Sequence, residues 1–315
     1  MKYILGIDTS AYTTSIALIN EENNEILADE RKVLEVKEGQ KGLRQQEAVF
    51  QHLKNLPELY ARITQDLLKV EIVSVSSRPR NEEGSYMPVF TAGRNFGKVI
   101  SHTLNCEFLE YSHQEAHISA SLIDNYKNID EFLAVHISGG TTEFISAKKI
   151  IKGFETKIVG GTKDITFGQL IDRLGIKMDF PFPCGKFMEE YIQGKSAGKL
   201  TTPAFSKDSY INLSGMENYF GSLTSTYKKE VIITSLFEYI AEYIVQIICN
   251  LSHLQHKTLI ISGGVASNSY IRNYIMENVK GYEILFPSVK NSSDNAVGVA
   301  FLPIIDRWYD EIKTN

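Results

Sequence analysis

Two histidines four residues apart, His113 and His117, are the residues of this chain whose spacing most directly suggests chemistry. Side chains at positions i and i+4 of a helix project from one face, so both imidazoles could bind the same metal ion. Such a pair, taken alone, is more often a surface or core feature than a metal site. A third ligand would have to come from elsewhere in the chain.

A zinc protease would need a glutamate directly after the first histidine of the pair. Here Glu115 stands two residues after His113, about 200° around a helix of 3.6 residues per turn. The spacing therefore argues against a protease of this class. It predicts that Glu115 is a solvated helix residue.

Two glycine turns, Ser138-Gly139-Gly140 and Ser262-Gly263-Gly264, each follow a short apolar run. A Gly-Gly turn after a strand exposes backbone N–H groups and lets a phosphate approach closely. One such pair is usually an ordinary turn, but two of them favour a nucleotide site. Asp8 ends the apolar N-terminal run, where it could either orient a ligand or only cap the next turn.

The elements around these residues can be predicted from apolar runs and turn signals. A strand, a hydroxyl-rich turn and a returning strand occur twice, roughly 130 residues apart, which predicts duplicated α/β domains around a cleft. The expected strands cover residues 3–8, 15–19, 71–77, 132–137, 143–146 and 257–262, and the expected helices cover residues 45–65 (interrupted at Pro57), 91–104 and 270–279.

The composition limits the class of protein. A chain of 315 residues is long enough for two domains with separate cores. Its formal charge of −5 argues against a free-standing nucleic-acid binder, so any RNA contact would need a local patch or a partner's surface. Three cysteines without CxxC spacing argue against a disulfide framework and suit a reducing cytoplasm.

The longest apolar stretch, residues 231–254, has helical spacing and contains Glu238 and Glu242. It is therefore predicted to be a core helix rather than a membrane span. The apolar run at the N-terminus is too short for the core of a signal peptide. We expect no association with a membrane.

These motifs, in this order, resemble the TsaD family of the actin-like and Hsp70-like nucleotide-binding superfamily. The resemblance runs over nearly the whole chain and implies two duplicated actin-like α/β domains, one from residues 1–119 and 296–315 and the other from residues 120–295. Family members transfer a threonylcarbamoyl group from its adenylate to N6 of an adenosine beside the tRNA anticodon. The matching segments are Gly6–Ser10, the histidine pair, both glycine turns, Gly160 with Thr162 and Asp164, Gly168–Asp172, Phe182–Gly185, Leu213–Gly215, Gly263–Asn268 and Asp294–Ala296.

The resemblance also implies roles for individual residues. His113, His117 and Asp294 match the family's metal ligands, and we expect one Fe or Zn ion per chain that acts as a Lewis acid. Asp8 and Asp172 are expected to act in catalysis by orienting the donor, an adenine nucleotide or a carbamoyl adenylate. The expected donor-binding residues are His136, Ile137, Ser138, Gly139, Gly140, Asp172, Gly185, Gly263, Gly264 and Asn268.

The chain also departs from the family pattern, most clearly at Arg78 and Arg80, where family members have a Gly-Pro-Gly loop. These arginines are either a charged loop or a clamp for a carboxylate or phosphate. The departures predict a divergent paralogue, and three functions stay open: tRNA modification, carbamoyl transfer to a small molecule or another RNA, and a non-catalytic nucleotide-sensing subunit. The expected partners are the adenylate donor, tRNA bound together with partner subunits, and a second copy or a related actin-like subunit.

Overall fold

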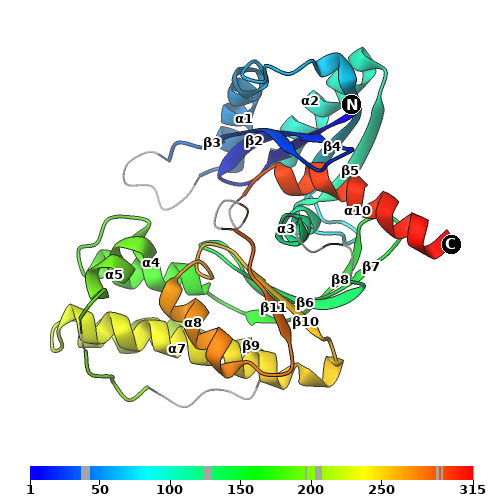
Figure 1. Cartoon of the computed structure of the whole chain (residues 1–315). Coiled ribbons are helices and arrows are strands. Elements are labelled where there is room, and N and C mark those ends of the chain that lie inside the picture. The colour runs from blue at the N-terminus through cyan, green and yellow to red at the C-terminus, as the bar shows by residue number, and fades with distance from the viewer. Residues whose placement is uncertain are drawn as a thin grey trace. The chain divides into compact units, whose positions relative to one another are not determined.

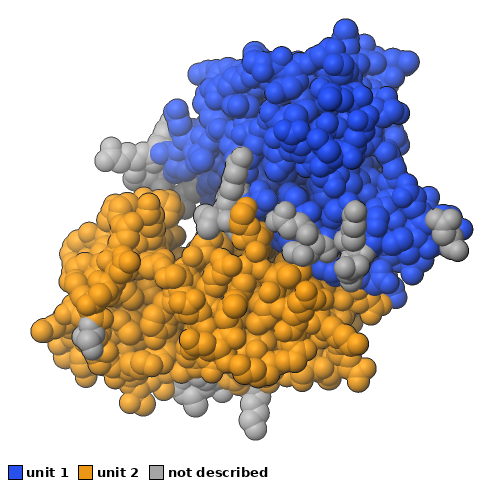
Figure 2. All heavy atoms as spheres, in the orientation of Figure 1, with its two compact units in different colours: residues 1–130, 148–155, 290–315 blue, residues 131–147, 156–289 orange. Residues whose placement is uncertain are grey.

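The computed structural model describes residues 1–36, 43–123, 126, 129–195, 197–202, 208–288, 291 and 294–314. The chain forms two compact units, coloured separately in Figure 2. Unit 1 comprises Met1–Asp130, Lys148–Glu155 and Lys290–Asn315, and unit 2 comprises Glu131–Ala147 and Thr156–Val289. Compared with the predicted domains, unit 1 gains residues 120–130, 148–155 and 290–295.

Unit 1 is built on a five-stranded mixed sheet with the strand order β3-β2-β1-β4-β5. Strands β1, β2 and β3 are antiparallel neighbours, whereas β4 runs parallel to β1 and β5 runs parallel to β4. The elements, shown in Figure 1, are β1 (Tyr3–Thr9), β2 (Thr13–Asn20), β3 (Ile26–Val33), α1 (Gln45–Tyr60), β4 (Val70–Arg78), α2 (Pro88–Leu104), β5 (Glu107–Ser112), α3 (His113–Leu122) and α10 (Val297–Thr314).

Helices cover both faces of this sheet, and neighbouring residues of β1, which point to opposite sides, contact different helices. A side chain at Gly6 would meet α10, since its Cβ would lie 2.6 Å from Cβ of Ala300. Ile7 points the other way, toward Gly93 and Gly97 of α2. The fully buried strands β1 and β2 therefore carry the loops at their ends on a rigid two-sided support.

Unit 2 contains a six-stranded sheet with the order β11-β10-β6-β7-β8-β9. Strand β10 runs parallel to both β6 and β11. The elements are β6 (Glu131–Ile137), β7 (Thr142–Lys149), β8 (Phe154–Thr162), α4 (Phe167–Lys177), α5 (Cys184–Ile192), β9 (Tyr210–Ile211), α6 (Ser214–Leu223), α7 (Lys229–Asn250), β10 (Thr258–Ser262), α8 (Ser269–Asn278) and β11 (Glu283–Leu285).

The predicted core helix corresponds to α7, whose apolar side chains belong to the core of unit 2. Among the described residues, the stretch Lys229–Leu254 is long and apolar enough to cross a membrane, but 67% of its most apolar window is buried inside the protein. This burial confirms the prediction that the stretch is a core helix.

The predicted interruption at Pro57 is wrong. Helix α1 continues past Pro57 to Tyr60, and the backbone N–H of Ala61 donates to the carbonyl oxygen of Pro57. Pro57 has no N–H to donate to the carbonyl oxygen of Leu53, so the helix loses one hydrogen bond there, but the residues after Pro57 keep helical geometry. The helix ends at Tyr60, five residues before the predicted end.

Candidate functional site

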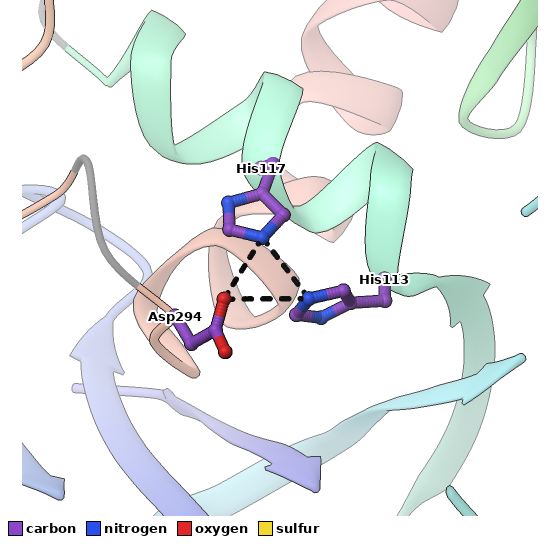
Figure 3. A group of neighbouring side chains, drawn as sticks. All are labelled: His113, His117 and Asp294. Atoms are coloured by element: carbon purple, nitrogen blue, oxygen red, sulfur yellow. Dashed lines mark hydrogen bonds and ion pairs between the residues drawn. The ribbon is translucent and has the colours of Figure 1, made fainter. Parts of the chain in front are cut away.

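His113, His117 and Asp294 meet in unit 1, as Figure 3 shows. The Nε2 atoms of the two histidines are 3.0 Å apart, and Oδ1 of Asp294 lies 3.5 Å from Nε2 of His113 and 3.2 Å from Nε2 of His117. His113 is the first residue of α3, which starts with a capping box made by Ser112 and Glu115. Asp294 comes from the segment that precedes α10.

The triangle of donor atoms has the dimensions of a metal site. Ligand bonds of about 2.0–2.2 Å in tetrahedral geometry place neighbouring donor atoms roughly 3.3 Å apart. The three observed separations of 3.0, 3.2 and 3.5 Å bracket this value. Two imidazoles and one carboxylate leave further coordination positions open, as a catalytic metal requires, and they suit Zn or Fe better than Mg.

Asp8 orients the first of these ligands. Its Oδ1 lies 2.8 Å from Nδ1 of His113, and its side chain is fully buried at the end of β1. An Nδ1–H that donates to a carboxylate leaves Nε2 of the neutral ring as the metal-binding atom. Oδ2 of Asp8 is also buried and has no hydrogen-bond partner among the described residues, so the bond to His113 is important for compensating this carboxylate.

Ser10 orients the third ligand in the same way. Its hydroxyl donates to Oδ2 of Asp294 at 2.7 Å, which leaves Oδ1 directed toward the two histidines. Asp8 lies near the end of β1, and Ser10 lies in the short turn that follows and leads to β2. The end of β1 and the turn after it therefore hold two of the three candidate ligands.

The charges of the site are strongly coupled. Burial disfavours the imidazolium form, but the carboxylates of Asp8 and Asp294 outweigh this effect and raise the pKa of His113 to about 10. Burial acts against the charge of Asp294 as well, yet hydrogen bonds with His113 and His117 hold its pKa well below the usual range. Binding of a metal ion must therefore displace a proton from His113.

The prediction that Glu115 is solvated is wrong. Its side chain is buried, and Oε2 accepts hydrogen bonds from the amide and the hydroxyl of Ser112, while Oε1 accepts one from the amide of Phe154. The segment Lys148–Glu155, which packs in unit 1, covers this side of α3. Glu115 therefore fixes the helix that carries the histidines, and Figure 3 shows both histidines facing Asp294.

Arg78 is anchored within its own loop. Its guanidinium donates to Oδ1 of Asn81 at 2.7 Å and to the hydroxyl of Ser77 at 3.3 Å, and it lies 3.9 Å from Oε2 of Glu115. These contacts give Arg78 a structural role in addition to any contact with a ligand.

In unit 2, the first glycine turn follows β6. The hydroxyl oxygen of Ser138 accepts from the amides of Gly140 and Thr141, and the hydroxyl of Thr166 donates to the carbonyl oxygen of Gly139. Apart from the chain neighbours of each glycine, no atom of the described residues lies within 4 Å of a Cβ built on Gly139 or Gly140, so the outer side of the turn is open. This space is available to a phosphate.

The second glycine turn follows β10 and lies beside the end of β6. Gly263 has a φ of +101°, and a Cβ there would lie 2.2 Å from the carbonyl oxygen of Ile137, so glycine is required on both counts. Gly264 again faces open space. Asn268 caps α8 by accepting from the amide of Ile271, and His136 pairs with the hydroxyl of Ser262 on the adjacent strand.

Asp172 lies on α4 beside the start of α5. Its Oδ1 accepts from the amide of Cys184 at 2.8 Å, and burial raises its pKa despite this hydrogen bond. Gly185 follows, and the nearest atom to its Cβ position, on Ile171, is 3.7 Å away. Burial, together with Asp172, raises the pKa of the Cys184 thiol to about 11, so this cysteine is not an activated nucleophile.

Sequence reasoning missed three polar residues at these sites. Ser10 donates to Asp294, His52 bonds to the backbone carbonyl of Ser10, and Glu189 of α5 accepts a hydrogen bond from the amide of Ser269 at the start of α8. Glu189 was detectable as a carboxylate four residues after Gly185 on a short helix. Ser10 lies in the matching segment Gly6–Ser10, but that resemblance implied no role for it, and His52 carries no signal because its partners are distant in sequence.

Comparison with known proteins decides the family. A family model described as TsaD, tRNA N6-adenosine threonylcarbamoyltransferase, matches residues 25–301. The chain belongs to the TsaD family. The matched range contains both histidines, Asp294 and the two glycine turns, while Asp8 and Ser10 lie before it.

Curated TsaD relatives match over almost their whole length. A tRNA N6-adenosine threonylcarbamoyltransferase of Thermotoga neapolitana is 26% identical over 310 residues, which cover 94% of this chain and 92% of the relative. The enzyme of the same name from a Sulfurihydrogenibium species is 28% identical, with 95% of this chain and 88% of the relative covered. The predicted family is thus confirmed.

Solved structures support the fold of this TsaD family member. The activator of the 2-hydroxyisocaproyl-CoA dehydratase from Clostridium difficile, with bound ADPNP, has a TM-score of 0.55 and 15% identity, and the match covers 99% of this chain and 98% of that one. HypF of T. kodakarensis has a TM-score of 0.63 and 11% identity, covering 98% of this chain and 48% of HypF. The predicted duplicated actin-like α/β fold is confirmed.

Proposed function

We propose that this chain transfers a threonylcarbamoyl group from its adenylate to N6 of a tRNA adenosine. The observation that carries the proposal is the TsaD family match over residues 25–301, which includes every candidate metal ligand. Relatives named for this tRNA modification align along more than 90% of the chain. These relatives favour tRNA modification over the alternatives of a small-molecule transferase and a nucleotide sensor.

The metal proposed for this activity is one Fe or Zn ion held by His113, His117 and Asp294. When bound, the ion would supply Lewis acidity toward a carbonyl or phosphate oxygen. The protein's own contribution is orientation: Asp8 keeps a proton on Nδ1 of His113, and Ser10 directs Oδ1 of Asp294 toward the ion.

The donor proposed for unit 2 is an adenylate or a related adenine nucleotide. The open outer sides of the turns at Gly139–Gly140 and Gly264 leave room for phosphate oxygens. The carboxylates of Asp172 and Glu189 would accept hydrogen bonds from hydroxyl groups of the donor. We include His136, Ile137, Ser138, Gly185, Gly263 and Asn268 as residues that line or shape this site.

The acceptor tRNA is proposed to bind with help from partner subunits, such as a related actin-like protein. With a formal charge of −5, this chain by itself offers little long-range attraction for a polyanion. Binding of tRNA to the isolated chain should therefore be weak and should weaken further with salt. A cytoplasmic location suits this substrate and the three free cysteines.

A transfer assay tests the proposal. The full chain is incubated with threonylcarbamoyl adenylate and tRNA, alone and with a related actin-like subunit, and the nucleosides are analysed by mass spectrometry. We expect N6-threonylcarbamoyladenosine in tRNA and none in a matched tRNA whose acceptor adenosine is guanosine. Donor consumption without modified tRNA, with a carbamoylated small molecule among the products, would instead identify a small-molecule transferase.

A further inference from the structure

The buried histidine His52 of α1 is connected to the candidate metal centre through the β1–β2 turn. Its Nε2 lies 2.8 Å from the backbone carbonyl oxygen of Ser10, and its Nδ1 lies 2.8 Å from the hydroxyl of Thr14. Asn55, one turn further along α1, donates to the same Thr14 hydroxyl at 3.2 Å. All of these side chains are buried.

The direction of each hydrogen bond follows from the chemistry of the groups. A carbonyl oxygen only accepts, so Nε2 of His52 carries the proton that is donated to Ser10. In the neutral ring Nδ1 is then an acceptor, and the hydroxyl of Thr14 donates to it. Burial lowers the pKa of His52, which agrees with a neutral ring.

The chain of contacts continues from the backbone of Ser10 to its side chain. The Ser10 hydroxyl donates to Oδ2 of Asp294 at 2.7 Å, while Oδ1 of Asp294 faces the two metal-site histidines. A displaced Ser10 would release Oδ2, and Asp294 could then rotate away from the triad. His52 fixes the backbone at the residue that controls this rotation.

We propose that His52 is a positioning residue for the metal centre, acting on Asp294 through Ser10. The inference rests on the proposed metal site. Under this inference, α1 influences the metal affinity of the site although none of the three candidate ligands lies on it. The relevant contact is the one from Nε2 to the carbonyl oxygen of Ser10, and the contact to Thr14 only orients the imidazole ring.

Two amide substitutions separate these contacts. The side-chain nitrogen of glutamine can take the place of Nε2, whereas that of the shorter asparagine takes the place of Nδ1. His52→Gln should therefore keep the hydrogen bond to Ser10, and its Zn²⁺ affinity should stay within about threefold of the wild type. The Zn²⁺ affinity of His52→Asn and His52→Phe should fall about tenfold. Ser10→Ala removes the hydrogen bond to Asp294 directly, so its Zn²⁺ affinity should fall about 10–100-fold.

The experiment measures Zn²⁺ affinity of the full chain by chelator competition, together with the visible absorption spectrum of the Co²⁺ form. Leu56→Ala, a buried substitution on the same helix whose side chain belongs to the apolar core of unit 1, controls for lost stability. It should lower Tm without changing Zn²⁺ affinity. In the double variant His52→Phe/Ser10→Ala, affinity should be no lower than in Ser10→Ala alone, because His52 acts through Ser10.

The outcomes distinguish this inference from the site on which it depends. Wild-type protein that binds neither Zn²⁺ nor Co²⁺ would overturn the metal site and the inference together. Wild-type binding that is unchanged in His52→Phe, or equally lost in Leu56→Ala, would overturn the role of His52 alone. Fully additive losses in the double variant would overturn the path through Ser10.

Discussion

Oδ1 of Asp8 lies 2.8 Å from Nδ1 of His113, across the imidazole ring from the nitrogen that faces His117 and Asp294. This arrangement assigns the two nitrogens of one ring to different tasks. Nδ1 keeps its proton and holds the ring in place, while Nε2 is left for a metal ion. Asp8 was expected from the sequence to orient the donor, and the structure gives it a direct contact with a candidate ligand.

The first prediction concerns this contact. Asp8→Asn removes the negative charge but keeps an oxygen that can accept from Nδ1, so Zn²⁺ affinity should fall about tenfold, and Asp8→Ala should lose up to about 100-fold. Chelator competition measures both values. Asp66→Asn, the same substitution at an exposed cap of unit 1, is the matched control. Equal Zn²⁺ affinity of Asp8→Asn and Asp66→Asn would show that Asp8 does not support the metal site.

The second prediction separates donor binding from folding at the first glycine turn. Gly139→Val should leave Tm unchanged, because the space around its Cβ is open, but it should weaken binding of an adenine nucleotide or carbamoyl adenylate about tenfold or more. Isothermal calorimetry measures the affinity. Gly198→Val, also in open space, should bind normally. Full affinity in Gly139→Val would place the donor elsewhere.

The third prediction is a pH dependence of stability in unit 2. Burial by itself would raise the pKa of Asp164, but the amides of Leu213, Ser214 and Ile165 outweigh it and lower the pKa to about 2. A carboxylate with a lowered folded-state pKa stabilises the protein above its unfolded value of 3.8, and this contribution disappears as the pH falls toward 2.

Asp164→Asn should therefore lower Tm at pH 7, and the difference from the wild type should shrink between about pH 4 and pH 2. Thermal melts across this pH range provide the measurement. A difference in Tm that is constant with pH would show that the carboxylate charge is not what stabilises the start of α6.

The fourth prediction concerns the arginine loop. Because Arg78 is paired with Asn81 and lies near Glu115, Arg78→Ala should lower Tm by roughly 1–3 °C. We expect Arg78→Ala/Arg80→Ala to weaken tRNA binding while donor affinity stays the same, since a guanidinium can contact backbone phosphates. Filter binding and calorimetry report the two affinities separately. The reverse pattern would assign the loop to the donor or to a small acceptor.

Much of this fold could be predicted from local sequence patterns. Strands β1, β6 and β10 are short apolar runs that end at Thr9, Ile137 and Ser262, and the sequence predicts the bounds of each to within one residue. The two histidines were found from their spacing alone. Only the family resemblance identifies Asp294 as a ligand, because it stands 177 positions after His117 and no local pattern joins them.

The remaining features depend on tertiary contacts that a linear pattern does not contain. Glu115 was expected to be solvated because helical spacing turns it away from His113, but the segment around Phe154 covers that face and buries it. The roles of Ser10 and His52 arise because the β1–β2 turn packs against both α1 and the segment before α10. Pro57 is a helix-breaking signal in the sequence, yet α1 continues through it to Tyr60 with the loss of one backbone hydrogen bond.

Metal analysis of the purified full chain is the measurement that most directly tests the central claim that His113, His117 and Asp294 form one metal centre. After loading with Zn²⁺ or Fe²⁺ and removal of excess ion, the wild type should retain one ion per chain. His113→Ala should retain almost none while its circular dichroism spectrum stays the same, and His102→Ala, an exposed histidine on α2, should match the wild type. An unchanged metal content in His113→Ala would contradict the assignment.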